Sequence, residues 1–364
     1  MEKVPPHMRY IRNVRKLIKE KVKMKQPSYS TGIDIASDDF VVSISTTPGI
    51  ALHGPKTFDN NRQGFKELDA WFKQIKIKPK EMIICMEATG VYGEHLCYFL
   101  HSYNYTVAVD PPLKVKRAFK IDGHKTDPVD SLQIAEYAIR FFDELNIWEP
   151  REDIVEKMKA LITTRELLVN HKTAATNSSS ALNRKAVRPT AANRTLKSHI
   201  QTLTKKIKTL EKEMDKLIQK EPQMSQMVKN LKSLPGVQNL LAFNMLVITN
   251  GFKTEKHYKE MNSYLKIAPV KHESGTSVYK KPRTPKFGPS IMRKLLHLAA
   301  RSVVTHKSDF RKYYIRKQKE GKANKLILNN VENKLVKIMC AVIRDHNSYI
   351  PNHISIHPNL LNNA

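Results

Sequence analysis

Between residues 30 and 145, short apolar runs alternate with stretches in which apolar residues recur every three or four positions. Runs of the first kind predict strands, and stretches of the second kind predict amphipathic helices. Two strands are expected within 32–44, further strands at 82–87 and 105–109, and helices at about 62–75, 91–102 and 127–142. A β-hairpin that leads into alternating strands and helices predicts a mixed sheet flanked by helices.

From about residue 152 to 222 the pattern changes to long helices without glycine. Apolar residues at spacings of four and three form a heptad seam at Leu196, Ile200, Leu203, Ile207, Leu210, Met214 and Leu217. A weaker seam precedes it at Ile154, Met158, Leu161, Leu168, Ala175 and Leu182. Because Arg188 and Pro189 separate the two seams, we predict an antiparallel helical hairpin with coiled-coil packing, within one chain or between subunits.

The C-terminal part begins with S-L-P-G-V at 233–237, between two apolar helical stretches. This segment resembles a helix–hairpin–helix element, in which backbone N–H groups at a helix start can contact phosphate, although an ordinary helix-linking turn looks the same. Residues 271–317 carry thirteen Lys or Arg against Glu273 and Asp309. They are predicted to form a polar, basic loop followed by a helix.

These changes in pattern divide the chain into five predicted parts. They are a basic N-terminal arm at 1–28, an α/β domain at 29–150, a helical coiled-coil arm at 151–222, a mainly α-helical domain at 223–345 and a flexible tail at 346–364. The arm carries nine Lys or Arg against two Glu. We expect it either to become ordered on nucleic acid or to be a solvated tail without a specific role.

Composition indicates the partner. The 364 residues include 63 Lys or Arg and 34 Asp or Glu, which gives a formal net charge of +29 and a pI near 9.9. Such a balance predicts a polyanion partner, nucleic acid or an anionic membrane surface. No run of eighteen apolar residues and no signal-peptide core is present, so an intracellular protein is expected. The three cysteines lack C-x-x-C spacing and are expected to be reduced.

Four carboxylates stand out against this basic background. Asp34 lies in an apolar strand, Glu87 ends another, and Asp127 and Asp130 are three residues apart on a predicted helix, where they share a face. Carboxylates gathered in this way repel one another unless a hard cation such as Mg²⁺ neutralises them. Each acid taken singly is an ordinary cap or surface group. Their order and contexts together predict the metal site of an RNase H-like nuclease.

Six motifs resemble one family and occur in that family's order over residues 30–320. They are G-I-D-I-A, M-E-A-T-G-V-Y, K-T-D-P-V-D-S, S-L-P-G-V, E-S-G-T-S-V and F-G-P-S-I-M-R-K-L-L-H-L-A-A. The chain resembles the transposases of the insertion-sequence one-hundred-ten family, which are DEDD transposases and bridge-RNA-guided recombinases. The resemblance implies an α/β RNase H-like (RuvC-like) domain, a helical coiled-coil insert and a mainly α C-terminal transposase domain.

The resemblance also implies roles for single residues. Asp34, Glu87, Asp127 and Asp130 would bind Mg²⁺, which Mn²⁺ can replace, and Ser274 would attack a DNA phosphate to form a covalent link. Expected partners are DNA of the element ends and the target, a noncoding guide RNA, and further copies of the chain in a homodimer or homotetramer. The expected location is the cytoplasm of a bacterium or archaeon, in association with the nucleoid. From their charge and position near Ser274, five residues are candidates to hold the phosphate: Lys280, Lys281, Arg283, Lys286 and Arg293.

Three functions remain open from the sequence. The first is an RNA-guided, metal-dependent serine recombinase. The second is a RuvC-like nuclease that uses a metal-activated water, with Ser274 in a structural role. The third is a nucleic-acid-binding scaffold without catalysis, for which the four carboxylates would not matter.

Overall fold

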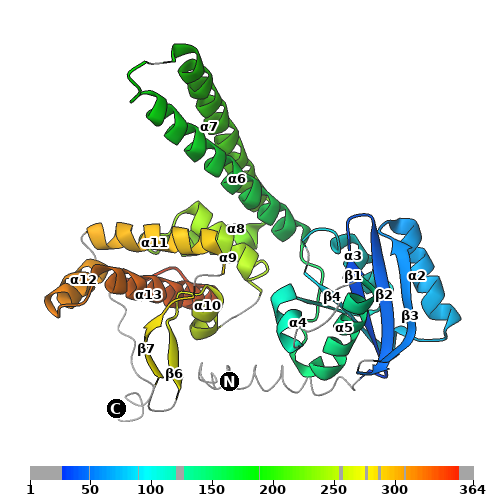
Figure 1. Ribbon diagram of the computed structural model, residues 1–364. Helices are drawn as coiled ribbons and strands as arrows, with labels where there is room; N and C mark the ends of the chain where they lie inside the picture. Colours follow the sequence, from blue (N-terminus) through cyan, green and yellow to red (C-terminus); the bar gives the residue numbers. More distant parts are fainter. Residues whose placement is uncertain are drawn as a thin grey trace, which may run out of the picture. The chain divides into compact units, whose positions relative to one another are not determined.

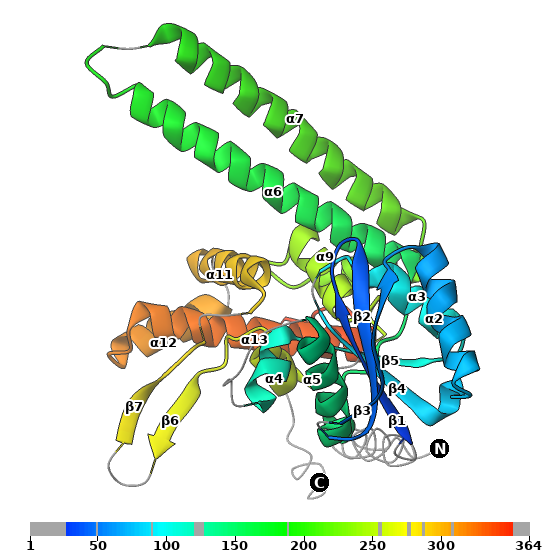
Figure 2. The same cartoon turned by 45° about the vertical axis from the view of Figure 1, so that its right-hand side comes forward.

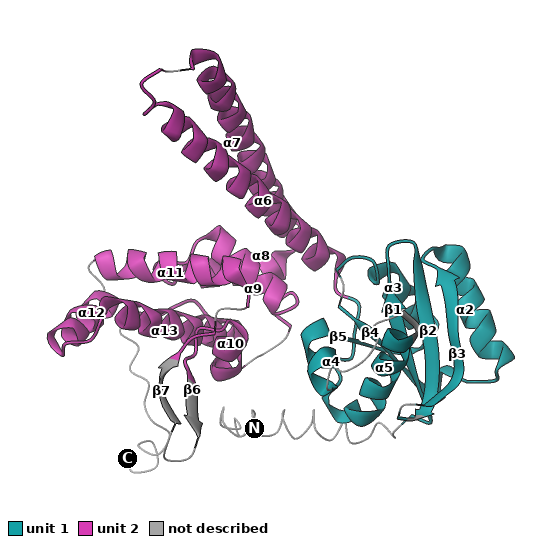
Figure 3. Cartoon of the chain, in the orientation of Figure 1, with its two compact units in different colours: residues 1–150 teal, residues 151–364 magenta. Residues whose placement is uncertain are grey.

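The computed structural model describes residues 27–48, 50–88, 90–119, 127–187, 189–253, 257–274, 278–285, 288–306 and 309–351. Within this range the side chains of 47, 127–128 and 271–282 are also outside the description. The chain forms two compact units, residues 1–150 and 151–364, which are described separately (Figure 3). Nearly all of the predicted basic arm and most of the predicted tail lie outside the described residues, and the five-part division stays a prediction.

The first unit is built on a five-stranded mixed sheet with the strand order β3-β2-β1-β4-β5 (Figures 1 and 2). The strands are β1 (Tyr29–Ile35), β2 (Asp39–Thr47), β3 (Ile50–Asp59), β4 (Met82–Glu87) and β5 (Thr106–Asp110). Strands β1, β4 and β5 are parallel, whereas β2 and β3 continue the sheet in antiparallel fashion. The mixed sheet predicted from the sequence is confirmed, and it is consistent with an RNase H-like domain.

Helices cover both faces of this sheet. Side chains alternate between the two faces along each strand, and the apolar residues on each face pack against helices. The helices are α2 (Arg62–Gln74), α3 (Glu94–Ser102), α4 (Pro112–Ala118) and α5 (Asp127–Arg140), with short 3₁₀ turns at Pro79–Glu81 and Phe142–Glu144. On one face Ile83 and Cys85 of β4 pack with Ile134 and Tyr137 of α5. On the other face, the alternate strand residues form a second cluster with α2 and α3.

Two elements of this unit differ from the prediction. Strand β3 was not expected, because Gly54-Pro55 in its middle is a typical chain breaker. It is an edge strand, where a proline without an N–H is tolerated, and Gly54 has a φ of +89° and room only for a hydrogen: a Cβ would lie 2.4 Å from the carbonyl oxygen of Val42. Helix α4 was also missed. Pro112 stands in its first turn, where a proline is tolerated.

In the second unit two long helices, α6 (Asp153–Leu182) and α7 (Thr190–Gln219), pack along each other (Figure 1). Leu203, Ile207 and Met214 of the predicted seam are buried. Across the pair, Arg165 Nε donates to Glu211 Oε1 at 2.7 Å. The helical hairpin of the prediction is present, whereas its coiled-coil character and its part in an assembly stay predictions.

The remainder of the second unit is mainly helical and shares one apolar core with the base of α6 and α7. Its elements are α8 (Pro222–Lys232), α9 (Asn239–Ile248), α10 (Tyr258–Tyr264), β6 (Val270–Ser274), β7 (Val278–Arg283), α11 (Ser290–Thr305), α12 (Asp309–Lys319) and α13 (Asn324–Asp345). The prediction of a basic loop at the start of residues 271–317 was wrong in one respect. Strands β6 and β7 pair there as an antiparallel hairpin.

The turn between α8 and α9 contains Gly236, which has a φ of +83°. A Cβ at this position would lie 2.7 Å from Val303 Cγ1 of α11, so the turn packs closely on that helix. Its helix–hairpin–helix character stays a prediction. None of the helices in the described part of the chain has the length and apolar composition needed to cross a membrane. The three cysteines are free, and burial raises the pKa of Cys97 to about 12.

Candidate metal centre

Three acidic residues lie at the same end of the sheet in the first unit, where the parallel strands finish. Asp34 is near the C-terminal end of β1, Glu87 ends β4 and Asp110 ends β5. These strands are neighbours and parallel, with Ile33 opposite Met86 and Glu87 opposite Asp110. Asp34, the residue after Ile33, is therefore in register with Glu87 across β1 and β4.

The three acids also point to the same face of the sheet. Ser30, Gly32 and Asp34 alternate onto one face of β1, and Ser30 Oγ donates to the carbonyl oxygen of Ala135 in α5 at 2.8 Å. Glu87 follows Cys85 in the same alternation, and Cys85 packs in the cluster that contains α5. The carboxylates of Asp34 and Glu87 thus extend from the face that α5 covers.

The first turn of α5 lies close to Asp34, because α5 approaches β1 very closely. A Cβ on Gly32 would lie 2.0 Å from the carbonyl oxygen of Ser131, and Ser131 Oγ shares a hydrogen bond of 2.8 Å with Ser43 Oγ of β2. Asp130 directly precedes Ser131. Ser30 contacts Ala135, whereas Gly32, two residues further along β1, also approaches Ser131, which is nearer to the start of α5. The next residue on this face of β1 is Asp34, and Asp130 lies at the start of α5.

The structure thus brings Asp34, Glu87 and Asp130 to one end of the sheet, and all three are half-buried. Asp127 is the first residue of α5, but its side chain lies outside the description. Among the described side chains, no group of three or more His, Cys, Asp or Glu is arranged to hold a metal ion. The four-carboxylate site stays a prediction. Its chemistry fits a hard cation, since all the candidate ligands are carboxylate oxygens.

Asp110 was missed by the sequence analysis, although it ends an apolar run just as Glu87 does. It is fully buried, and it accepts hydrogen bonds from Tyr137 Oη at 3.0 Å, from Lys114 Nζ at 3.5 Å and from the Asn146 amide. Burial, followed by the charge of Asp110, raises the pKa of Tyr137 above its usual range. These donors satisfy Asp110 within the protein, so we assign it a structural role beside the candidate site.

Asn60 connects the two loops that follow the candidate ligands. Its side-chain amide donates to the carbonyl oxygen of Ala36 at 2.9 Å and to that of Tyr92 at 3.1 Å. Ala36 lies two residues after Asp34, and Tyr92 lies in the loop that follows Glu87. Because an amide nitrogen carries two hydrogens, these two bonds use its full donor capacity. Asn60 is therefore a positioning residue for the loops beside Asp34 and Glu87.

Replacing Asn60 with Asp is expected to loosen both loops, because a carboxylate of the same shape has no hydrogen to donate and repels the two carbonyl oxygens. The expected loss of stability is about 1–2 kcal/mol, reduced by partial exposure to water. Amide hydrogen exchange should become faster at 36–38 and 91–93 while the strands keep their protection. Asn61→Asp is the matched control, since Asn61 caps α2 through its side-chain oxygen, which aspartate retains. Unchanged exchange in Asn60→Asp would contradict the assignment.

In the second unit, Ser274 is the last residue of β6 and pairs with Val278 of β7. Its side chain and those of Lys280 and Lys281 lie outside the description, as does Lys286 altogether. Arg283 ends β7 and is exposed. Arg293 of α11 donates through Nη1 to the carbonyl oxygen of Pro285 at 3.0 Å, so it helps to hold the segment between β7 and α11. The structure therefore describes the backbones of β6 and β7, and the chemistry of Ser274 stays a prediction.

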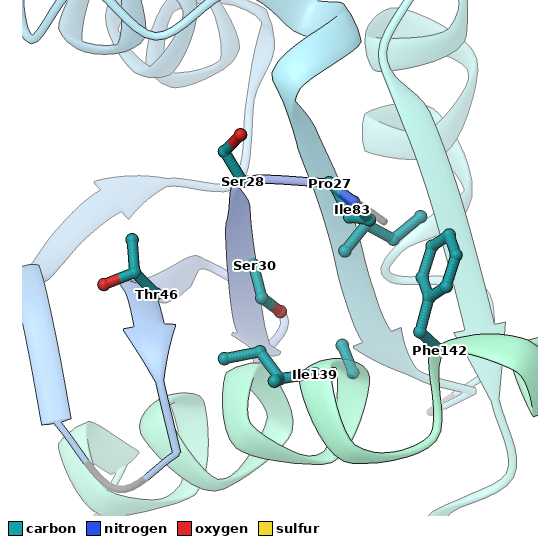
Figure 4. A pocket seen from close by; sticks show the side chains of 8 residues that line it. Pro27, Ser28, Ser30, Thr46, Ile83, Ile139 and Phe142 are labelled. Carbon is teal, nitrogen blue, oxygen red and sulfur yellow. The ribbon is translucent and has the colours of Figure 1, made fainter. Parts of the chain in front are cut away.

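At the opposite end of the sheet a small cavity lies between the start of β1 and the end of α5 (Figure 4). It is lined by Ser30, Ile83, Ile139 and Phe142 among others, and its volume is about 40 Å³. This volume suits a few water molecules and is far below the several hundred Å³ of ligand pockets. The cavity is a packing feature and not a substrate site.

Comparison with known proteins identifies the family of the chain. Residues 31–185 match a family described as transposase, the DEDD transposases of the insertion sequence IS110. Residues 228–315 match the "Transposase IS116/IS110/IS902 family". The chain is 28% identical over 328 residues to the pilin gene-inverting proteins of Moraxella lacunata and Moraxella bovis, which covers 87% of this chain and 96% of each relative.

These matches define a transposase or recombinase. The chain belongs to the IS110 family of transposases. Membership implies a DNA-cleaving enzyme with DNA as its substrate, and the DEDD type implies dependence on a divalent metal ion. The family resemblance drawn from six short motifs is confirmed.

Proposed function

We propose that this protein is a recombinase that cuts and rejoins the DNA of an insertion element through a covalent serine intermediate. The nucleophile is Ser274, and the metal ligands are Asp34, Glu87, Asp127 and Asp130. The observation that carries the proposal is the common end and common face of Asp34, Glu87 and the first turn of α5, in a chain that matches DEDD transposases.

A bound Mg²⁺ would neutralise phosphate oxygens and polarise the P–O bond under attack. In the step itself, Ser274 Oγ attacks a backbone phosphorus and one P–O bond to deoxyribose breaks, so that the departing oxygen takes up a proton and the serine loses one. The phosphodiester energy is kept in the new Oγ–P bond. Attack by another DNA end on that bond rejoins the strand and releases the serine without an external energy source.

The basic residues near the serine hairpin would stabilise the charge on the phosphate during this exchange. Arg283 is exposed and available for such contacts, and Lys280, Lys281 and Lys286 are proposed alongside it. Arg293 is proposed as a phosphate contact that also supports the segment before α11. Target choice through a noncoding RNA, action as a dimer or tetramer, and RNA binding belong to the same proposal.

A denaturing-gel assay tests this function. Purified protein is mixed with Mg²⁺, RNA transcribed from the flanks of the element, and DNA carrying labelled element ends. Wild type is expected to give a protein–DNA band that survives denaturation, and Ser274→Ala is expected to give none. Ser290→Ala, at the start of α11, is the matched control and should keep the band. Cleavage without a covalent band, equal in wild type and Ser274→Ala, would replace the proposal with a nuclease that uses a metal-activated water.

A further inference from the structure

A second pocket of the first unit lies where strands β4 and β5 begin, at the end of the sheet opposite to the carboxylates. It has a volume of about 340 Å³ and is lined by Asp69, Lys73, Lys76, Ile77, Lys78, Pro79, Tyr103 and Tyr105. These residues come from the end of α2, the segment before β4 and the segment between α3 and β5. The volume falls within the range of ligand pockets, unlike that of the cavity beside β1.

The floor of this pocket is apolar and its rim is cationic. Ile77 and Tyr105 are buried beneath it, and Tyr103 is 42% exposed. Of the rim lysines, Lys73 is paired with Asp69 at 2.6 Å, and Asp69 also accepts from Tyr105 Oη at 2.8 Å. The Asp69 carboxylate therefore already has two partners, Lys73 and Tyr105, in the wall of the pocket.

Two further lysines of the rim have no such partner. Within the described part of the chain, neither Lys76 nor Lys78 forms an ion pair, and the nearby Glu81 accepts from the backbone N–H of Lys78 at 3.1 Å. Both lysines are exposed. Their ammonium groups are free to contact an anion at the mouth of the pocket.

The Tyr103 ring is held in place before any ligand arrives. It stacks on Phe99 with 4.5 Å between ring centroids and 26° between planes, and Lys73 Nζ lies 5.8 Å from its centroid. A fixed aromatic ring offers a flat surface for a nucleobase at low entropic cost, and every base can stack in this way.

The backbone at Lys76 gives a further indication. Lys76 has a φ of +60°, in the left-handed region after the end of α2, where glycine is the usual residue. A residue with a Cβ is less stable than glycine in this conformation. The chain thus holds a lysine at the pocket rim where glycine would fit more easily.

We propose that this pocket binds a nucleotide of a single-stranded nucleic acid, with the base on Tyr103 and the neighbouring phosphates on Lys76 and Lys78. A duplex cannot enter in this way, because its bases are already stacked and paired. Strands β4 and β5 separate the pocket from Glu87 and Asp110 by on the order of 15–20 Å. The pocket therefore holds a strand away from the carboxylates, and its action does not depend on the proposed metal site.

Lysine footprinting on the full chain tests the proposal, with EDTA present so that metal chemistry is absent. The probes are oligo-dT, oligo-U and a duplex, each of about twelve nucleotides, and modification of Lys76 and Lys78 by an amine-reactive reagent is read by mass spectrometry. Single strands are expected to protect both lysines and the duplex is not. The oligonucleotide that protects the two lysines at the lower concentration shows whether the pocket prefers DNA or RNA.

Two variants make the test specific. Tyr103→Ala is expected to raise the oligonucleotide concentration needed to protect Lys78 by about five-fold or more. Lys76→Gly should weaken protection of Lys78 while the Tm stays equal or rises, because glycine relieves the positive φ. Lys205 on α7 is the internal control, and its protection should be the same in all variants. Equal protection by the duplex, no protection of Lys76 and Lys78, or full protection in Tyr103→Ala would each overturn the proposal.

Discussion

Asp34→Asn and Glu87→Gln variants are expected to fold like the wild type and to lose DNA cleavage by about 100-fold or more. Each substitution keeps the size of the side chain and removes one negative charge from the proposed metal site. Metal coordination contributes several kcal/mol to stabilisation of the transition state, and every 1.36 kcal/mol corresponds to a factor of ten in rate. Because both side chains are half-buried at strand ends, the strands themselves should be little affected.

The measurement combines strand cleavage with metal binding by calorimetry, using Mn²⁺ and Mg²⁺ in turn. Glu94→Gln is the matched control, since Glu94 is an exposed carboxylate in the first turn of α3. It should keep both activity and affinity. Full cleavage activity in Asp34→Asn, with unchanged metal affinity, would contradict the metal site.

Gly32→Ala is expected to destabilise the first unit by about 3 kcal/mol or more. The added Cβ would lie 2.0 Å from the carbonyl oxygen of Ser131 and 2.3 Å from the backbone nitrogen of Ala135. Both are backbone atoms of α5, so relief requires the whole helix to move away from the sheet. That movement would break the hydrogen bonds of Ser30 with Ala135 and of Ser43 with Ser131.

The same movement would separate the first turn of α5 from Asp34, so a folded Gly32→Ala protein should also bind metal more weakly. Chemical denaturation and calorimetry measure the two effects. Gly93→Ala is the control, because its Cβ would meet only the side-chain ends Ile35 Cδ1 at 3.1 Å and Met86 Sδ at 3.4 Å. It should cost less than about 1 kcal/mol. A Gly32→Ala protein as stable as wild type would show that α5 does not pack on β1 as closely as described.

Strands β1, β4 and β5 and helix α5 could be predicted from the sequence, because each has a strong local pattern of its own. β3 could not, since an edge strand tolerates Gly54-Pro55 and a local reading treats that pair as a turn. The β6–β7 hairpin was also missed. Its segments, Val270–Ser274 and Val278–Arg283, are rich in charge, and their pairing depends on contacts that hydrophobic periodicity does not report.

The family, the order of the acidic motifs and the preference for a polyanion could be inferred from residue types and spacing alone. Which acids lie close together depends instead on how the elements pack. Strand register places Asp34 beside Glu87, and the absence of a side chain at Gly32 lets α5 bring Asp130 to the same end. Burial with Tyr137 and Asn146 gives Asp110 a structural role, although its local sequence resembles that of Glu87. Side-chain type is local information, whereas proximity and burial arise from packing between segments distant in the chain.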